Sequence, residues 1–214
     1  MPMDVVVAGG HGQIGLRLLR LLAERGDKAR GLIRNPDHAG ELEAAGAEAI
    51  VCDLEFEQDI APFVAGAEAI VFAAGAGPGS GAERKRTMDL GGALKLIEAA
   101  RSDGIARYVM ISAIGAGRPD TVSEQMRPYI EAKAEADRAL AASGLDYTIV
   151  RPGRLTDDPG TGLVLVGDKV DYGEVTRDDV AATVVAVLNA PSTVGKSFEL
   201  VGGETPIEEA VRSL

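Results

Sequence analysis

The sequence predicts an α/β fold in which a doubly wound parallel sheet of about seven strands carries helices on both faces. Short apolar runs alternate with stretches of helical periodicity along most of the 214 residues. Several of these runs are continuously apolar, as expected for strands that helices cover on both sides. Several helical stretches end at a glycine just before the next apolar run, which is typical of β–α–β units. We therefore expect one domain over residues 1–214.

Seven segments are expected to be strands, because each is a short apolar run bounded by turn residues or by a helical stretch. They are Asp4–Ala8, Ala29–Ile33, Ala49–Val51, Ala69–Ala73, Arg107–Ile111, Tyr147–Arg151 and Ser197–Val201. Five segments with apolar residues at helical spacing are expected to be helices. They are Gly12–Arg25, Pro36–Ala45, Ala82–Asp103, Pro128–Ser143 and Arg177–Asn189. This alternation predicts parallel strands joined by crossover helices.

A seven-residue pattern occurs twice in the first third of the chain. Ala45–Val51 and Ala65–Val71 both read Ala-Gly-Ala-Glu-Ala-Ile-Val. Two copies are too few for a repeat architecture, which needs at least about three repeats for stability. We interpret both copies as the same kind of junction, in which a helix ends and a strand begins.

The segment Pro152–Val175 is the least regular part of the chain and is rich in Gly, Asp and Thr. It follows a predicted strand, so we expect it over the carboxyl-terminal edge of the sheet, where open α/β sheets bind ligands. It is too short for a separate substrate domain. We interpret it as a small C-terminal segment on the substrate side.

The composition limits the classes of function. A net charge of −11 argues against non-specific nucleic-acid binding, which needs a positive surface. No apolar stretch reaches the roughly 18 residues of a membrane span, and the chain does not start like a signal peptide. One cysteine, Cys52, excludes an internal disulfide and fits a cytoplasmic protein in which it is a buried small hydrophobe. His11 and His38 have no spaced partners, so we expect exposed loop histidines and no metal site.

A glycine-rich stretch follows the first predicted strand and leads into the first predicted helix. It reads Gly9, Gly10, His11, Gly12, Gln13, Ile14 and Gly15. Glycines at this spacing allow a tight turn, a close approach of the backbone to a pyrophosphate and close packing of the helix on the strand. The helix N-terminus favours the negative charge of the pyrophosphate. This context predicts a Rossmann-type dinucleotide site, and the alternative is an ordinary glycine turn.

The end of the second predicted strand indicates which dinucleotide is bound. NAD-selective sites place a carboxylate there for the ribose hydroxyls, whereas this chain has Arg34. A guanidinium suits the 2′-phosphate of NADP through charge-assisted hydrogen bonds. The sequence therefore favours NADP, with NAD still possible. The alternative is an ordinary solvent-facing arginine.

The next two strand ends are also expected to line the cofactor. Asp53 and Leu54 follow the third strand, and Asp53 could accept a hydrogen bond from the adenine amino group or could cap a turn. Ala73, Ala74 and Gly75 end the fourth strand. Small residues there allow the backbone to approach the cofactor, and a plain flexible loop is the alternative.

Tyr129 and Lys133 are four residues apart and share one face of a predicted helix. A lysine ammonium near a phenol stabilises the phenolate and so lowers the pKa of the tyrosine. Such a tyrosine can exchange a proton with a substrate oxygen while a nicotinamide exchanges a hydride. The spacing alone is common, and the alternative is a surface pair.

Taken together, these residues resemble those of the short-chain dehydrogenase/reductase superfamily, and the likeness covers nearly the whole chain. The sequence is most similar to short, atypical members described as NAD(P)-binding epimerases or dehydratases, and also to NmrA-type and biliverdin/flavin-reductase-type proteins. The residues that carry the likeness are Gly9–Gly15, Arg34, Asp53–Leu54, Asp89, Arg107–Ser112, Tyr129–Lys133, Ser143–Gly153 and Thr176–Ala181.

The resemblance implies roles for several residues. Tyr129 is expected to be the acid/base, and Lys133 to hold the nicotinamide ribose and tune Tyr129. The strand end at Ile111 and Ser112 is expected on the cofactor side. The turn formed by Arg151, Pro152 and Gly153 is expected to lie against the nicotinamide. Asp89 falls where many members have an active-site Asn, and the alternative for it is an ordinary acid on a helix surface.

Two features depart from the family pattern. Ile114 occupies the usual position of a catalytic Ser or Thr, and Ser112 lies two residues earlier. Either Ser112 is a substitute, or the hydroxyl that orients the substrate is absent. The chain ends at Leu214, so a large nucleotide-sugar substrate is not expected. We therefore expect an NADP-preferring oxidoreductase or epimerase-like protein that acts on a small carbonyl or alcohol. The alternative is a catalytically weak or inactive NADP(H)-binding sensor or assembly factor, and the sequence leaves open a monomer or a homodimer.

Overall fold

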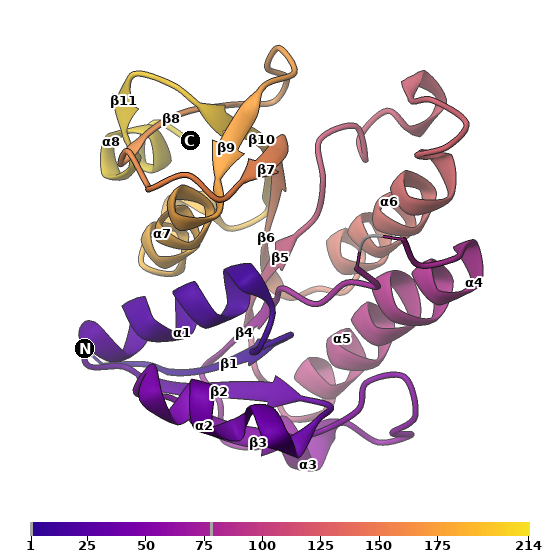
Figure 1. Ribbon diagram of the computed structural model, residues 1–214, viewed down its shortest axis with the longest axis vertical. Coiled ribbons are helices and arrows are strands. Elements are labelled where there is room, and N and C mark those ends of the chain that lie inside the picture. The colour runs from indigo at the N-terminus through magenta and orange to yellow at the C-terminus, as the bar shows by residue number, and fades with distance from the viewer. Residues whose placement is uncertain (1, 78) are drawn as a thin grey trace.

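The seven predicted strands form the parallel part of one sheet, in the order β3-β2-β1-β4-β5-β6-β10 (Figure 1). The computed structural model describes residues 2–77 and 79–214, so Met1 and Pro78 lie outside the described residues. The strands are β1 (Asp4–Ala8), β2 (Lys28–Ile33), β3 (Glu48–Val51), β4 (Ala69–Phe72), β5 (Arg107–Ile111), β6 (Asp146–Pro152) and β10 (Lys196–Gly202). The strand order changes direction between β1 and β4, which is where doubly wound sheets bind ligands. The predicted fold class is confirmed.

Two more strands extend the sheet beyond β10, and both run antiparallel to their neighbours. They are β8 (Leu163–Gly167) and β11 (Thr205–Pro206), which give the sheet nine strands. A separate parallel pair is formed by β7 (Arg154–Thr156) and β9 (Glu174–Thr176). The expectation of an irregular Pro152–Val175 is therefore wrong in part, because its Gly- and Asp-rich composition hides the short apolar run of β8.

Helices cover both faces of the sheet. The main ones are α1 (Gln13–Glu24), α2 (Ala39–Ala44), α3 (Ala61–Val64), α5 (Ala93–Ser102), α6 (Arg127–Ala141), α7 (Arg177–Leu188) and α8 (Ile207–Arg212). Shorter elements are the 3₁₀ turns η1 (Pro36–His38), η3 (Pro119–Thr121) and η4 (Pro191–Thr193). No helix within the described residues is long and apolar enough to cross a membrane.

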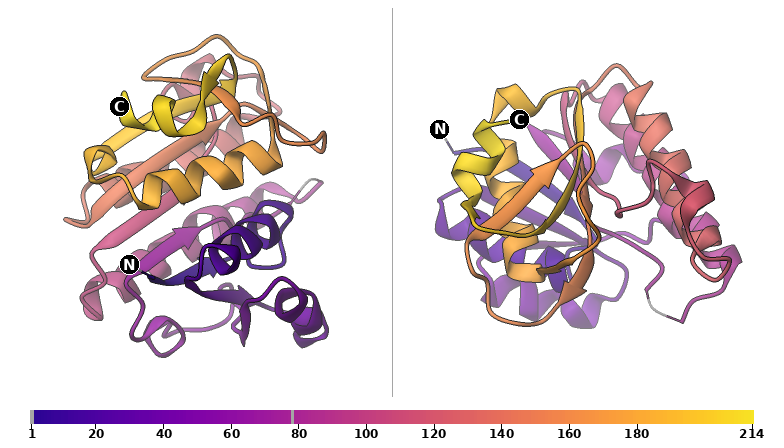
Figure 2. Two further views of the ribbon diagram at one scale, coloured as in Figure 1. Left: turned by 90° about the vertical axis from the view of Figure 1, so that its left-hand side faces the viewer. Right: turned by 90° about the horizontal axis from the view of Figure 1, so that it is seen from above.

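The apolar core has two layers, one on each face of the sheet. Strand side chains alternate between faces, so Val5 and Val7 join one layer while Val6 and Ala8 join the other. The first layer includes buried residues of α1, α7 and α8, and the second includes those of α3, α5 and α6. Figure 2 shows α5 and α6 on one side of the sheet and α7 and α8 on the other. Continuously apolar strands are needed because both faces are covered.

The repeated seven-residue pattern forms the same junction twice, as interpreted from the sequence. Gly46 follows α2 with φ +82° and leads into β3, and Gly66 follows α3 with φ +75° and leads into β4. This left-handed backbone region favours glycine. The helix α3 itself was not predicted, because it is a single turn of four residues.

The predicted helix Ala82–Asp103 consists of three joined parts. A short α4 (Ala82–Arg84) leads into the π-helix η2 (Lys85–Gly92), and α5 follows directly. A π-helix adds a residue per turn and is frequent at functional sites. Here the π-helix contains Asp89 and turns its side chain inward, so that only 1% of the residue is exposed.

Cys52 follows β3 and is buried, with 3% of its surface exposed, as expected from the sequence. Its backbone N–H donates to the carbonyl of Ile33 at 2.8 Å. Burial raises the pKa of the thiol to about 11, and the nearby carboxylates of Glu57 and Asp53 act in the same direction. The protonated thiol is therefore the dominant form at neutral pH.

This pKa predicts an unreactive thiol in the folded protein. At pH 8 about one Cys52 in a thousand is a thiolate, roughly a hundredfold fewer than for an ordinary cysteine. We expect the reaction with Ellman's reagent at pH 8 to be at least about a hundredfold slower for the native protein than for the protein in urea. Equal rates in the two states would contradict the assignment of a buried, protonated thiol.

Candidate functional site

The glycine turn joins the carboxyl end of β1 to the start of α1. Gly12 is the N-cap of α1 and has an extended backbone. No side chain caps this helix end, and its first turn contains no acidic residue. The N–H groups of the first turn are therefore available to an anion, which the helix dipole also favours.

Close packing explains why the turn needs glycine. A Cβ on Gly15 would lie 2.1 Å from the carbonyl oxygen of Gly9, and a Cβ on Gly9 would lie 2.7 Å from Cα of Ala74. Gly9 also has φ +82°. A Cβ on Gly12 meets only the Gly9 oxygen, at 3.0 Å, so the outer side of Gly12 is open. This cradle, with its uncapped helix end, fits the pyrophosphate of a dinucleotide.

Arg34 is exposed just after β2, on the same edge as the glycine turn. Within residues 2–77 and 79–214 its side chain makes no hydrogen bond or ion pair. Nearby, Asn35 Oδ1 accepts a hydrogen bond from the N–H of Asp37 at 3.1 Å and caps η1. The arginine is therefore held on an ordered turn with its charge uncommitted.

His11 and His38 are half-buried rather than fully exposed, because the two rings stack on each other. Their centroids are 3.5 Å apart and the rings are inclined by 15°. His11 Nε2 also lies 2.9 Å from Glu41 Oε1. In the part of the chain that the structure describes, no group of His, Cys, Asp or Glu could hold a metal ion.

Asp53 caps a turn after β3, which is one of the two alternatives for this residue. Its Oδ1 accepts a hydrogen bond from the N–H of Glu55 at 2.9 Å. Sequence reasoning missed Lys95 on α5, whose Nζ donates to the carbonyls of Leu54, Glu55 and Glu57 at 3.0, 3.1 and 2.7 Å. These contacts fix the loop, and the contact of Asp53 with adenine stays a prediction.

Asp89 and Lys133 form a buried ion pair at the carboxyl ends of β4 and β5. Asp89 Oδ1 lies 3.4 Å from Lys133 Nζ, and the residues are 1% and 3% exposed. Asp89 Oδ2 accepts from the N–H of Ala76 at 3.1 Å, and Lys133 Nζ donates to the carbonyl of Ile111 at 3.2 Å. The alternative of an ordinary surface acid is therefore wrong for Asp89.

Tyr129 lies one turn before Lys133 on α6, and both belong to the predicted helix. Lys133 Nζ is 6.0 Å from the centroid of the Tyr129 ring, and Lys85 Nζ is 5.0 Å from it. Burial raises the pKa of Tyr129, Lys133 acts in the opposite direction, and Asp89 and Asp137 add to the increase. The effect of Lys133 has the expected sign, but burial outweighs it.

Asp137 extends this group by one more turn of α6, and sequence reasoning missed it. Asp137 is 3% exposed, and its Oδ2 accepts from Arg151 Nε at 2.9 Å. Burial raises the pKa of Asp137, while Arg151 and Ser112 act in the opposite direction. The i, i+4, i+8 spacing of Tyr129, Lys133 and Asp137 was the available signal.

Ser112 lies at the end of β5 beside this group. It is 4% exposed, and its Oγ has no hydrogen-bond partner within the described ranges. Ile114, at the usual Ser or Thr position, is half-buried, and its N–H donates to the carbonyl of Pro152 at 2.9 Å. Ser112 is therefore the side-chain hydroxyl at this strand end, and its catalytic role stays a prediction.

The turn after β6 is packed as tightly as the glycine turn. A Cβ on Gly153 would lie 2.3 Å from the carbonyl oxygen of Gly173. The N–H of Gly153 donates to the carbonyl of Leu200 at 2.9 Å. Pro152 is buried, while the Arg151 side chain reaches α6 through Asp137. Contact of this turn with nicotinamide stays a prediction.

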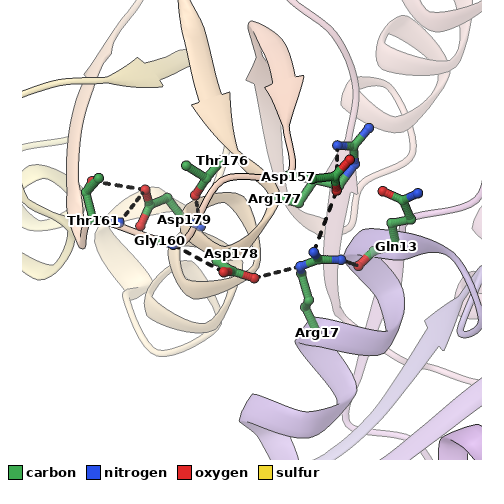
Figure 3. A network of polar contacts seen from close by, with 9 residues as sticks. All are labelled: Gln13, Arg17, Asp157, Gly160, Thr161, Thr176, Arg177, Asp178 and Asp179. Atoms are coloured by element: carbon green, nitrogen blue, oxygen red, sulfur yellow. Dashed lines mark hydrogen bonds and ion pairs between the residues drawn. The ribbon is translucent and has the colours of Figure 1, made fainter.

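A polar network holds the loop after β7 against α1 and α7 (Figure 3). Arg17 Nε donates to Asp178 Oδ1 at 2.6 Å, and Asp178 Oδ2 accepts from the N–H of Gly160 at 3.2 Å. Asp179 accepts from the N–H groups of Thr161 and Gly162 at 3.0 and 2.8 Å. The Thr176–Ala181 motif therefore anchors residues 160–162 next to α1.

Comparison with known proteins agrees with this geometry. The model of a family described as NAD(P)H-binding matches residues 9–191. The uncharacterized sugar epimerase YhfK of Bacillus subtilis is 44% identical over 99% of this chain and 100% of its own length. A more distant relative is the photosystem II assembly factor Ycf39 of Guillardia theta, 25% identical over 94% of this chain and 65% of its own length.

Two solved structures are similar over almost the whole chain. One, from Bacillus halodurans, is named provisionally as an NAD-dependent epimerase/dehydratase. It is 39% identical with a TM-score of 0.95, and the match covers 99% of this chain and 100% of that chain. The other is the oxidoreductase ylbE of Lactococcus lactis, which is 29% identical with a TM-score of 0.88 over 99% and 96% of the two chains.

The open side of Gly12 provides a test of the glycine cradle. We expect Gly12→Val to abolish the binding of NADPH and NADH, because a branched side chain fills the space at the uncapped end of α1. Nucleotide fluorescence titration measures the binding, and circular dichroism checks the fold. Gly167→Val is the matched control, since its Cβ meets nothing closer than 3.5 Å. Retained binding in Gly12→Val would refute the cradle.

Proposed function

The chain belongs to the NAD(P)H-binding family, and from this premise we propose that it is an NADP-preferring oxidoreductase or epimerase-like protein of the atypical short-chain dehydrogenase/reductase type. It acts on a small carbonyl or alcohol. The observation that carries the proposal is the half-buried Tyr129 beside the buried ion pair of Lys133 and Asp89, on the same sheet edge as the glycine cradle. A protein that only bound the nucleotide would not need this group.

The dinucleotide is held along the edge from β2 to β6. The glycine turn takes the pyrophosphate, and Arg34 takes the 2′-phosphate through its uncommitted guanidinium. The strand ends at Ala73–Gly75 and Ile111–Ser112 line the middle of the cofactor. When bound, the nicotinamide supplies the hydride acceptor or donor for the substrate carbon.

Tyr129 moves the proton of the reaction. Its hydroxyl donates a proton to the carbonyl oxygen in the reducing direction and receives one in the oxidising direction. Lys133 stabilises the phenolate that this transfer leaves, and Asp89 together with the carbonyl of Ile111 holds the ammonium in place. Because burial raises the pKa of Tyr129, the tyrosine is protonated at neutral pH and is ready to act as the acid.

The second candidate is a dinucleotide-binding protein without turnover. It is favoured by the relative Ycf39, an assembly factor, and by Ile114 at the usual Ser or Thr position. Both candidates require the same cofactor site. They differ in whether NADPH is consumed when carbonyl compounds and flavins are supplied, so a reductase screen separates them.

Arg34 provides the test of cofactor preference. We expect the wild-type protein to bind NADPH at least about tenfold more tightly than NADH, since a charged hydrogen bond contributes about 1.5–3 kcal/mol. Arg34→Ala should remove most of this difference by weakening NADPH alone. Isothermal titration calorimetry measures both affinities, with Arg212→Ala, an exposed arginine on α8, as the control. Equal affinities of the wild-type protein for NADPH and NADH would refute the role of Arg34 in binding the 2′-phosphate.

Tyr129 provides the test of catalysis. With a substrate from the screen, Tyr129→Phe should lower kcat by about 10²–10⁴, the usual contribution of a general acid, while leaving the affinity for NADPH unchanged. The matched control is Tyr172→Phe, because Tyr172 is 72% exposed and lies in the loop before β9, on a different element from Tyr129. Undiminished kcat in Tyr129→Phe would remove this residue from the mechanism.

A further inference from the structure

Arg151 has hydrogen-bond donors that the rest of the described chain does not use. Its Nε donates to Asp137 Oδ2 at 2.9 Å. Neither Nη nitrogen has an acceptor among residues 2–77 and 79–214, although only 17% of the side chain is exposed. A guanidinium has five N–H donors. The four on the Nη atoms are therefore free for a ligand, in surroundings that are largely shielded from solvent.

The acid opposite Arg151 on the neighbouring strand β10 is already engaged. Glu199 is the register partner of Arg151 on β10 and is 1% exposed. Its Oε1 accepts from Arg118 Nη2 at 2.9 Å, and its Oε2 accepts from the N–H of Val170 at 3.0 Å. Glu199 therefore compensates Arg118 and leaves the Nη groups of Arg151 without a partner.

An exposed glycine lies next to these donors on one side. Gly117 is exposed, and a Cβ there would lie 3.0 Å from Arg151 Nη1. On the other side, β5 pairs with β6 so that Ile111 lies opposite Val150. The next residues along the two strands, Ser112 and Arg151, are therefore neighbours. The Ser112 Oγ is buried and close enough to the Asp137 carboxylate to lower its pKa. A guanidinium fork on β6 and a hydroxyl just after β5 thus lie on neighbouring strands beside the Tyr129 group.

We propose that Arg151 binds a carboxylate of the substrate, so that the protein acts on oxo acids or on the corresponding hydroxy acids. The inference rests on the proposed function and names its substrate class. The planar Nη pair matches the two oxygens of a carboxylate. A phosphate dianion fits less well, because Arg118 is committed to Glu199 and the Asp137 carboxylate is in contact with Arg151.

The reaction balances with one NADPH and one proton from solvent, which restores the Tyr129 hydroxyl after each turnover. The carbonyl carbon gains a hydride from the reduced nicotinamide, the carbonyl oxygen gains the Tyr129 proton, and NADPH becomes NADP⁺. The carboxylate is unchanged and serves to orient the substrate. Tyr129 and Asp137 are eight residues apart on α6, about 12 Å along the helix axis. We therefore expect acids with several bonds between the carboxylate and the carbonyl to be the better substrates.

Matched pairs of acid and amide test this inference. The NADPH-loaded protein is titrated with 2-oxopentanoate, 4-oxopentanoate and 5-oxohexanoate and with the three amides, and NADPH oxidation is followed in parallel. At least one acid should bind roughly ten- to a hundredfold more tightly than its amide. Inorganic phosphate is the competing probe, and we expect it to displace the acid weakly.

Two variants assign the effect to Arg151. Arg151→Lys keeps the charge beside Asp137 but loses the planar fork, and we expect it to remove the preference for the acid. Gly117→Ala should also reduce the preference, because its Cβ crowds Arg151 Nη1 while the guanidinium itself is kept, so it tests the site even where Arg151→Lys folds poorly. Arg154→Lys, an exposed arginine on β7 paired with Glu174, is the control.

The outcomes separate the inference from the proposed function. Acid binding without NADPH oxidation supports the carboxylate site and counts against the oxidoreductase. The carboxylate site alone is overturned if NADPH is oxidised equally with acids and with amides. It is also overturned if Arg151→Lys and Gly117→Ala keep the preference for the acid over the amide. Tighter binding of inorganic phosphate than of the acids, or no binding of any acid, also overturns the carboxylate site.

Discussion

The ion pair between Lys133 and Asp89 is the interaction on which the candidate site depends. A lysine that is 3% exposed must be compensated, because a buried charge left without its partner costs about 3–5 kcal/mol. Asp89 and the carbonyl of Ile111 provide this compensation, and they bring together the π-helix, the end of β5 and α6. The position of Tyr129, one turn away on α6, is fixed by the same contact. Backbone in the loop after β4 is fixed as well, through the N–H of Ala76.

The glycine turn imposes a second constraint that acts at the other end of the sheet edge. Gly9 packs against Ala74, and Gly15 packs against Gly9, with no room for a Cβ at either glycine. The turn therefore sets the spacing between β1, β4 and α1, and it leaves the start of α1 uncapped toward the edge. Because Ala74 is close to Ala76, which contacts Asp89, the cradle and the buried ion pair meet in one short loop.

The sequence predicted the parts of the structure that follow from local patterns. The seven strand segments, the five helical segments, the glycine turn and the pairing of Tyr129 with Lys133 on one helix face all depend on spacing within about ten residues. What it did not predict depends on contacts between distant segments. Asp137 meets Arg151, Lys95 meets three carbonyls of another loop, and Asp89 is turned inward only because the helix takes a π-helical turn. The strand β8 was hidden for a similar reason, since its antiparallel pairing with β10 stabilises an apolar run that lies within a Gly- and Asp-rich segment.

The arrangement of charge on this edge is better explained by ligand binding than by stability. Three buried or half-buried pairs follow one another on the α6 side of the sheet, namely Asp89 with Lys133, Asp137 with Arg151, and Glu199 with Arg118. Such pairs can often be replaced by apolar residues at no cost in stability, whereas fixed dipoles and charges are what a polar reaction needs around it.

Each pair is neutral, and the chain as a whole carries a charge of −11. An anionic ligand can therefore be held only where a cation keeps free donors, and two such cations on this edge are Arg34 at the end of β2 and Arg151 at the end of β6. The two positions lie at opposite ends of the site, which is the arrangement required for a phosphorylated dinucleotide at one end and an acidic substrate at the other.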